Sequence, residues 1–150
     1  MAAIRPLDPD DIPAALLLWQ GTSPLGKREV ETERGLARFL ERNPGISQVA
    51  CDGDALIGIA VCGHDGRRGF LHHIGVAAAR RRRGIAHKMV EACLAALYAE
   101  GITRVHVQLK LDNAGGMRFW KSLGCGVRKD AVLISLLLKS DDPTEGPDDA

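Results

Sequence analysis

The run of arginines at residues 80–83 and the small residues that follow it have the composition of an anion-binding segment. An apolar, strand-like stretch ends at Val76, and Arg81-Arg82-Arg83-Gly84-Ile85-Ala86 then opens an amphipathic helix. The start of a helix carries unpaired backbone N–H groups and the positive end of the helix dipole. Small residues there let an anion reach the backbone, and arginines add fixed positive charge. We therefore expect this segment to hold a pyrophosphate.

The rest of the chain predicts an α/β domain in which strands and helices position this motif. Apolar periodicity and turn residues favour the element order β-α-α-β-β-β-α-β-α-β-β. The expected strands cover residues 2–5, 46–51, 55–62, 70–76, 104–109, 127–128 and 132–138. The expected helices begin near Asp8, Arg28, Gly84 and Asn113, and end near Gln20, Arg42, Gly101 and Leu123.

Length and composition are those of one soluble globular domain, with 150 residues, 45% hydrophobic and 26% charged. The net charge is +1, but residues 141–150 carry five acids and no base, so residues 1–140 carry +6. That excess suits an anionic ligand and does not demand nucleic acid. We expect a folded domain over residues 1–139 and an acidic, disordered tail over residues 140–150.

The cysteines and the apolar segments indicate a cytoplasmic protein. The four cysteines form no Cys-x-x-Cys pair, so we expect no metal or redox site. We find no signal peptide, and the apolar run at residues 131–138 is far too short to cross a bilayer. A reducing cytoplasm is the compartment consistent with these features.

Two motifs resemble those of the GNAT superfamily, the GCN5-related N-acetyltransferases. The family's phosphate motif, Gln/Arg-x-x-Gly-x-Gly/Ala, reads here as residues 81–86, and the strand before it ends in Ile74-Gly75-Val76. A later family motif, roughly Asn-x-x-Ala-x-x-Phe-Tyr-x-x-x-Gly-Phe, reads as residues 113–125. The element order agrees over residues 1–138. The resemblance implies a GNAT fold, with a mixed, mostly antiparallel, splayed sheet of six to seven strands flanked by about four helices.

The resemblance also implies an activity and its cosubstrate. It implies an acetyl-CoA-dependent N-acetyltransferase, in which a primary amine attacks the thioester directly and a tetrahedral intermediate forms. The acceptor is left open between a small amine, an amino-acid derivative and a protein N-terminus. Dimers are common in the superfamily, but the sequence places no interface.

Carried over residue by residue, the resemblance implies roles for three segments. The strand backbone at Ile74, Gly75 and Val76 would pair with the pantetheine arm and supply an N–H, first of all that of Ile74, to the oxyanion. Gly75 independently indicates a bulge or a close backbone approach, as glycine within a strand often does. The pyrophosphate would be held by Arg81, Arg82, Arg83, Gly84, Ile85 and Ala86. Asn113 and Phe119 would line the pantetheine side.

One position departs from the family pattern, because Trp120 stands where relatives often have the tyrosine that protonates the leaving thiolate. An indole N–H can donate a hydrogen bond but is no acid near neutral pH. The single tyrosine, Tyr98, is about 21 Å along its helix from Gly84, at ~1.5 Å per residue. Water, Ser122 or Cys125 remain as alternatives, and we predict acetyl transfer without a tyrosine acid.

The pair Gly115-Gly116 is a second departure. It indicates either a close approach to the cofactor or a frayed first helical turn.

An alkylammonium acceptor must lose a proton before it attacks, so a base is needed. His72, His73 and His106 are the candidates, and each is alternatively a structural strand residue. Strict strand alternation would place His73 on one face with Leu71 and Gly75, and His72 on the other. We favour His73 as the base.

Two other classes of function stay open. Trp120 is compatible with a CoA-binding regulatory module that has lost catalysis. The arginine run alone is also found in nucleic-acid-binding domains, although few aromatic residues accompany it here. The first would bind CoA without transferring acetyl groups, and the second would show a salt-dependent affinity for DNA or RNA.

Overall fold

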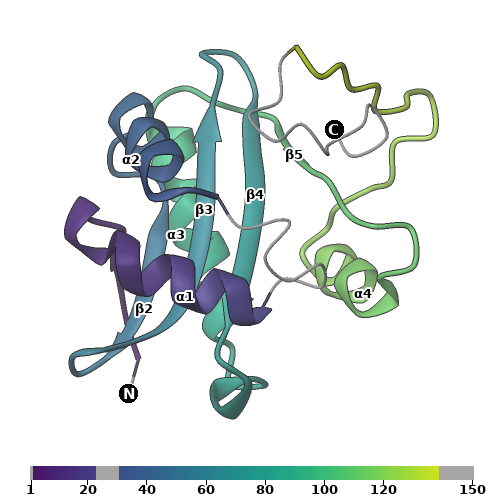
Figure 1. Ribbon diagram of the computed structural model, residues 1–150. Coiled ribbons are helices and arrows are strands. Elements are labelled where there is room, and N and C mark those ends of the chain that lie inside the picture. The colour runs from purple at the N-terminus through teal and green to yellow at the C-terminus, as the bar shows by residue number, and fades with distance from the viewer. Residues whose placement is uncertain (1, 23–30, 139–150) are drawn as a thin grey trace. The chain divides into compact units, whose positions relative to one another are not determined.

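The computed structural model describes residues 2–22 and 31–138. The chain divides into two compact units, Met1–Gln108 and Leu109–Ala150, each described by itself below. In the first unit helices cover both faces of an open sheet (Figure 1). The described part of the second unit contains one helix. The expected acidic tail lies outside the described residues.

The sheet of the first unit has five strands, whose spatial order, β1-β2-β3-β4-β5, is also their order along the chain. Strands β1 to β4 pair antiparallel, and β5 pairs parallel with β4. This confirms the expected mixed, mostly antiparallel sheet. The strand bounds are Ala3–Pro6 (β1), Gln48–Asp52 (β2), Ala55–His64 (β3), Gly69–Val76 (β4) and Val105–Val107 (β5).

Three helices cover the sheet, with α1 and α2 on one face and α3 on the other (Figure 1). Their bounds are Ile12–Thr22 (α1), Glu33–Arg42 (α2) and Ile85–Ala99 (α3). On the first face, a buried cluster joins both helices to β2 and β3 and includes Trp19, Leu36, Leu40, Val49, Ile59 and Val61. On the second face, Met89 and Cys93 of α3 are fully buried. The two layers of apolar side chains hold β4 and its loop in place.

Capping residues, more than the periodicity of apolar residues, determine where the helices begin. Asp8 caps a short 3₁₀ turn, Pro9–Asp11 (η1), by accepting the N–H of Asp10 at 2.9 Å, and α1 then continues to Thr22, two residues beyond the expected end. The start expected for the second helix at Arg28 lies outside the described residues. In the described structure α2 begins at Glu33, because Thr32 Oγ1 accepts the N–H of Gly35 at 2.9 Å and so caps the helix.

The second unit contains α4, Ala114–Ser122, and no strand in its described residues. The strands expected at 127–128 and 132–138 are wrong, since residues 125–138 form neither helix nor strand. A strand needs a hydrogen-bonded neighbour and usually one buried face. Here Val132 is 82% exposed and Leu133, its neighbour of opposite parity, is 70% exposed, so neither face of the segment is buried. The described sheet therefore has five strands rather than six to seven.

No helix in the described ranges combines the length and the apolar character needed to span a membrane.

Candidate active site

The segment that joins β4 to α3 turns sharply at Arg82 and Gly84. Their backbones are both left-handed, with φ of 63° and 76°, and they follow a 3₁₀ turn, Ala78–Arg80 (η3). Gly84 is the N-cap of α3 and has no side chain with which to cap the first turn. Nothing in the described structure lies within 4 Å of the place where a Cβ on Gly84 would stand. A pyrophosphate fits this segment, because the first N–H groups of α3 are open to an approaching anion.

The arginines of the run differ in their surroundings. Arg80 forms an ion pair with Asp52, the last residue of β2, and this pairing holds the pKa of the Asp52 carboxyl below its usual value. The Arg81 Nε–H donates to the carbonyl of Val76, the last residue of β4, at 3.2 Å. Arg81, Arg82 and Arg83 are exposed. Two arginines thus fasten the loop to the sheet, and three place exposed charge beside the helix N-terminus.

Strand β5 pairs with only the N-terminal part of β4. Strand β5 pairs with β4 only at Gly69, Phe70 and Leu71, whereas β3 follows β4 as far as Val76. The expected pantetheine-pairing residues, Ile74 to Val76, therefore lie beyond the part of β4 that pairs with β5 in the described structure.

A β-bulge at His72 interrupts the alternation of side chains along β4. Val61 pairs with His73 and Cys62 pairs with Leu71, so His72 is an extra residue on β4. His73 consequently lies on the α1/α2 face with Gly75, and Leu71 lies on the other face. The expectation that His73 shares a face with Leu71 is wrong for this reason, and the part that concerns Gly75 holds.

Two residues of α1 contact the His73 side chain. The Trp19 ring stacks on the imidazole, with centroids 4.7 Å apart and an interplanar angle of 8°. Thr22 Oγ1 lies 3.0 Å from Nε2 of the same ring. Trp19 is only 8% exposed and belongs to the buried cluster, so the stack rests on the core. Neither Trp19 nor Thr22 lies in a sequence motif, so no local signal marks either residue as part of a site.

Thr22 also explains Gly75. A Cβ on Gly75 would stand 2.3 Å from Thr22 Oγ1 and 2.8 Å from Thr22 Cβ. Such distances are closer than side chains tolerate, so the end of α1 can lie over β4 only where the strand has glycine. The close approach predicted at Gly75 is therefore made by α1, and the bulge is three residues earlier.

The other two candidate bases lie among aromatic rings. His72 contacts Phe39 edge-on at 5.4 Å and stacks with Phe70 at 5.9 Å. Phe70 also contacts His106 at 5.7 Å. Desolvation lowers the pKa of His72 below its usual value, although much of its side chain stays exposed. His72 and His106 thus form an aromatic group with Phe70, separate from the Trp19–His73–Thr22 group.

The remaining predicted site residues, Asn113, Phe119 and Trp120, belong to the second unit. Asn113 Oδ1 accepts the N–H of Gly116 at 2.8 Å and caps α4. A Cβ on Gly116 would stand 2.7 Å from Asn113 Nδ2, so this glycine makes room for the cap. The Phe119 and Trp120 rings meet edge-on at 5.0 Å. The structure thus groups the predicted residues into two sets, one in each unit.

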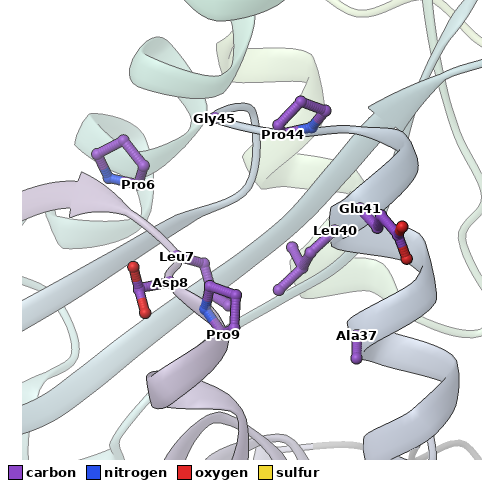
Figure 2. Close-up of a pocket in the computed structure, with 9 residues that line it drawn as sticks. All are labelled: Pro6, Leu7, Asp8, Pro9, Ala37, Leu40, Glu41, Pro44 and Gly45. Carbon is purple, nitrogen blue, oxygen red and sulfur yellow. The ribbon is translucent and has the colours of Figure 1, made fainter.

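A pocket of about 560 Å³ lies between the end of β1 and α2 (Figure 2). Its lining is mostly apolar and includes Pro6, Pro9 and Leu40, with Glu41 at its edge. None of the predicted site residues lines it.

Comparisons with known proteins agree with this geometry. The model of the acetyltransferase (GNAT) family matches residues 14–125. An acetyltransferase of Pectobacterium atrosepticum is 28% identical over 120 residues, which are 80% of this chain and 84% of the relative. An aminoglycoside acetyltransferase from a soil metagenome, solved with sisomicin, has a TM-score of 0.76 at 18% identity and covers 92% of this chain and 97% of its own. A chain of the NatC complex, solved with Gag peptide and CoA, has a TM-score of 0.71 at 20% identity and covers 81% and 82%.

The chain therefore belongs to the acetyltransferase (GNAT) family. It is an N-acetyltransferase, and acetyl-CoA is the acyl donor at the level of this family.

Proposed function

We propose that this protein transfers the acetyl group of acetyl-CoA to a primary amine, with His73 as the general base and the loop before α3 as the pyrophosphate site. The observation that carries the proposal is the backbone of that loop. Two left-handed residues, Arg82 and Gly84, lead into a helix N-terminus that is open to an anion. Acetyl-CoA supplies the thioester that the amine attacks.

On this proposal, N–H groups between residues 82 and 86 bind the pyrophosphate, with Arg81, Arg82 and Arg83 as the nearby positive charges. The backbone at Ile74, Gly75 and Val76 holds the pantetheine arm along the edge of β4 that β5 does not cover. The N–H of Ile74 donates to the carbonyl oxygen as negative charge develops there. Asn113 and Phe119, in the second unit, stay predicted pantetheine-binding residues.

His73 takes the proton that the alkylammonium acceptor must lose. The side chain lies on the same strand face as Gly75 and is fixed by contacts from α1. A fixed imidazole is suited to this role because histidine is the side chain that most often acts as a general base. Replacement by alanine should remove the acid limb of the pH–rate profile, and an unchanged limb would exclude His73 as the base.

The leaving thiolate needs no strong acid. A thiol has a pKa of about 8.5, so its thiolate is a fair leaving group near neutral pH. We propose that solvent protonates the thiolate and that Trp120 contributes shape and hydrogen bonding only. Acetylation assays decide whether the acceptor is a small amine, such as an aminoglycoside, or a peptide N-terminus.

Calorimetric titration of acetyl-CoA into the full chain tests the first half of the proposal, with the double variant Arg82→Ala/Gly84→Asp as control. Micromolar binding that the control abolishes supports the site. A panel of small amines and peptides with free N-termini then tests transfer. Binding without transfer to any amine would identify a CoA-binding module. An absence of binding would refute the cofactor site, and the arginines would then be tested with DNA and RNA at several salt concentrations.

A further inference from the structure

We infer that Thr22 fixes the tautomer of His73, so that Nε2 carries the hydrogen and Nδ1 is the nitrogen that gains the proton. The inference rests on His73 being the base proposed above. It adds a positioning residue that belongs to no sequence motif and lies 51 positions from the histidine.

The argument begins from the single hydrogen of the Thr22 hydroxyl. Oγ1 lies 2.9 Å from the carbonyl oxygen of Leu18, 3.3 Å from that of Trp19 and 3.0 Å from His73 Nε2. Carbonyl oxygens only accept hydrogen bonds. If the hydroxyl donated to Nε2, two oxygen atoms would stand 2.9 Å apart with no hydrogen between them, which is repulsive. The hydroxyl therefore donates to Leu18, as threonine commonly does within a helix.

It follows that Thr22 Oγ1 is the acceptor in its contact with His73, and that Nε2 is the donor. The neutral imidazole has one N–H, so the hydrogen on Nε2 leaves the lone pair on Nδ1. The imidazolium form also has an N–H at Nε2. The same hydrogen bond is therefore kept before and after proton uptake, and the proton moves at Nδ1.

Two further contacts keep this arrangement in place. Trp19 and Thr22 are three residues apart on α1 and so lie on one face of the helix; Trp19 stacks on the imidazole at 4.7 Å and holds its plane. Gly75 leaves the space that Thr22 occupies, since a Cβ there would stand 2.3 Å from Oγ1. Trp19 thus fixes the plane of the ring, and Gly75 leaves room for the hydroxyl beside it.

Side-chain ¹⁵N NMR of the full chain measures the tautomer directly, with the His73 signals assigned from their loss in His73→Gln. We expect neutral His73 to carry its hydrogen on Nε2. Thr22→Val keeps the shape of the side chain and removes the acceptor. The ratio of the Nε2–H tautomer to the Nδ1–H tautomer should therefore fall by about 2- to 12-fold, the equivalent of one ordinary hydrogen bond. Thr22→Ser keeps the hydroxyl and should restore the ratio. A wild-type histidine with its hydrogen on Nδ1, or a ratio unchanged in Thr22→Val, would overturn the inference.

Amine acetylation provides the second readout. Thr22→Val should lower kcat in proportion to the fraction of neutral His73 that carries its hydrogen on Nε2, leave the KM for acetyl-CoA unchanged, and be rescued by Thr22→Ser. A kcat that does not follow this fraction would overturn the link to catalysis. If the wild-type protein acetylates no amine, the proposed function fails, while the NMR result still decides the tautomer.

Discussion

The two ends of α3 provide a matched pair of substitutions that separates backbone strain from cofactor binding. Gly84 precedes the helix with φ of 76°, and Gly101 follows it with φ of 84°. Nothing in the described structure lies within 4 Å of a Cβ at either position, so alanine meets no clash and only the left-handed backbone opposes it. That conformation costs a residue with a side chain about 1–2 kcal/mol. Gly101→Ala should therefore lower the free energy of unfolding by about 1–2 kcal/mol, and Gly84→Ala by that amount at most.

Only one of the two substitutions should weaken the binding of acetyl-CoA. In Gly84→Ala, the loop can relieve its strain by leaving the conformation that exposes the first N–H groups of α3. Binding must then restore that conformation, so the part of the ~1–2 kcal/mol that the free loop relieves is subtracted from the binding energy, and Kd rises by up to about 5- to 30-fold. Gly101 ends the helix in a Schellman motif, in which the Ile102 N–H donates to Leu97 at 3.1 Å. Its substitution should leave Kd unchanged.

Denaturant unfolding measures the first quantity and calorimetry the second. Each 1 kcal/mol should also lower Tm by about 2–4 °C for a chain of this length. Equal weakening of acetyl-CoA binding in both variants would refute the assignment of the pyrophosphate to the N-terminus of α3. An unfolding free energy unchanged in both would refute the strain argument itself.

Three further predictions concern other parts of the chain. Trp120→Phe should keep kcat within a few-fold, since the indole is no acid; loss of all turnover with intact acetyl-CoA affinity would contradict this. The Arg5 hydrogen bond lowers the pKa of Asp11, so its stabilisation is present above pH ~4 and lost as the pH falls further. Asp11→Asn should therefore cost about 1 kcal/mol or less at pH 7, with the difference from wild type vanishing in acid, as measured by urea unfolding at several pH values; a pH-independent difference would contradict it. Exposed Cys125 should react with a thiol reagent in the folded protein, whereas fully buried Cys93 should react only on unfolding, and rapid modification of Cys93 would show that the α3 core opens readily.

The features that sequence could predict are those that depend on neighbours along the chain. Asp8 and Asn113 cap helices because their side chains reach backbone N–H groups two or three residues away. The first five strands follow from apolar alternation, and Gly84 marks the turn before α3 because few other residues adopt its backbone. Each of these signals lies within a few residues of the structure it specifies.

The features that sequence could not predict depend on contacts between distant segments. Thr22 reaches His73 only because α1 ends over β4, and a threonine at the end of a helix gives no sign of this. The sequence predicts a bulge or a close backbone approach at Gly75, and a close approach to the cofactor or a frayed helical turn at Gly116. In the structure, each glycine makes room for a particular side chain, that of Thr22 or of Asn113. Residues 132–138 show the reverse case, in which strand-like alternation has no strand in the structure.

The bulge at His72 has a consequence for how this chain should be aligned with its relatives. A relative that lacks the extra residue would appear to differ by one alignment gap in β4. Because Leu71 and His73 pair with the consecutive residues Cys62 and Val61, a gap placed at His72 keeps every other side chain of β4 on its own face of the sheet. An alignment without that gap would match residues on one side of the bulge with residues of the opposite face, so a relative's histidine corresponds to His73 only where the gap is placed at the bulge. Transfer of catalytic residues across this family should therefore compare the pairing of β3 with β4 as well as the residue letters.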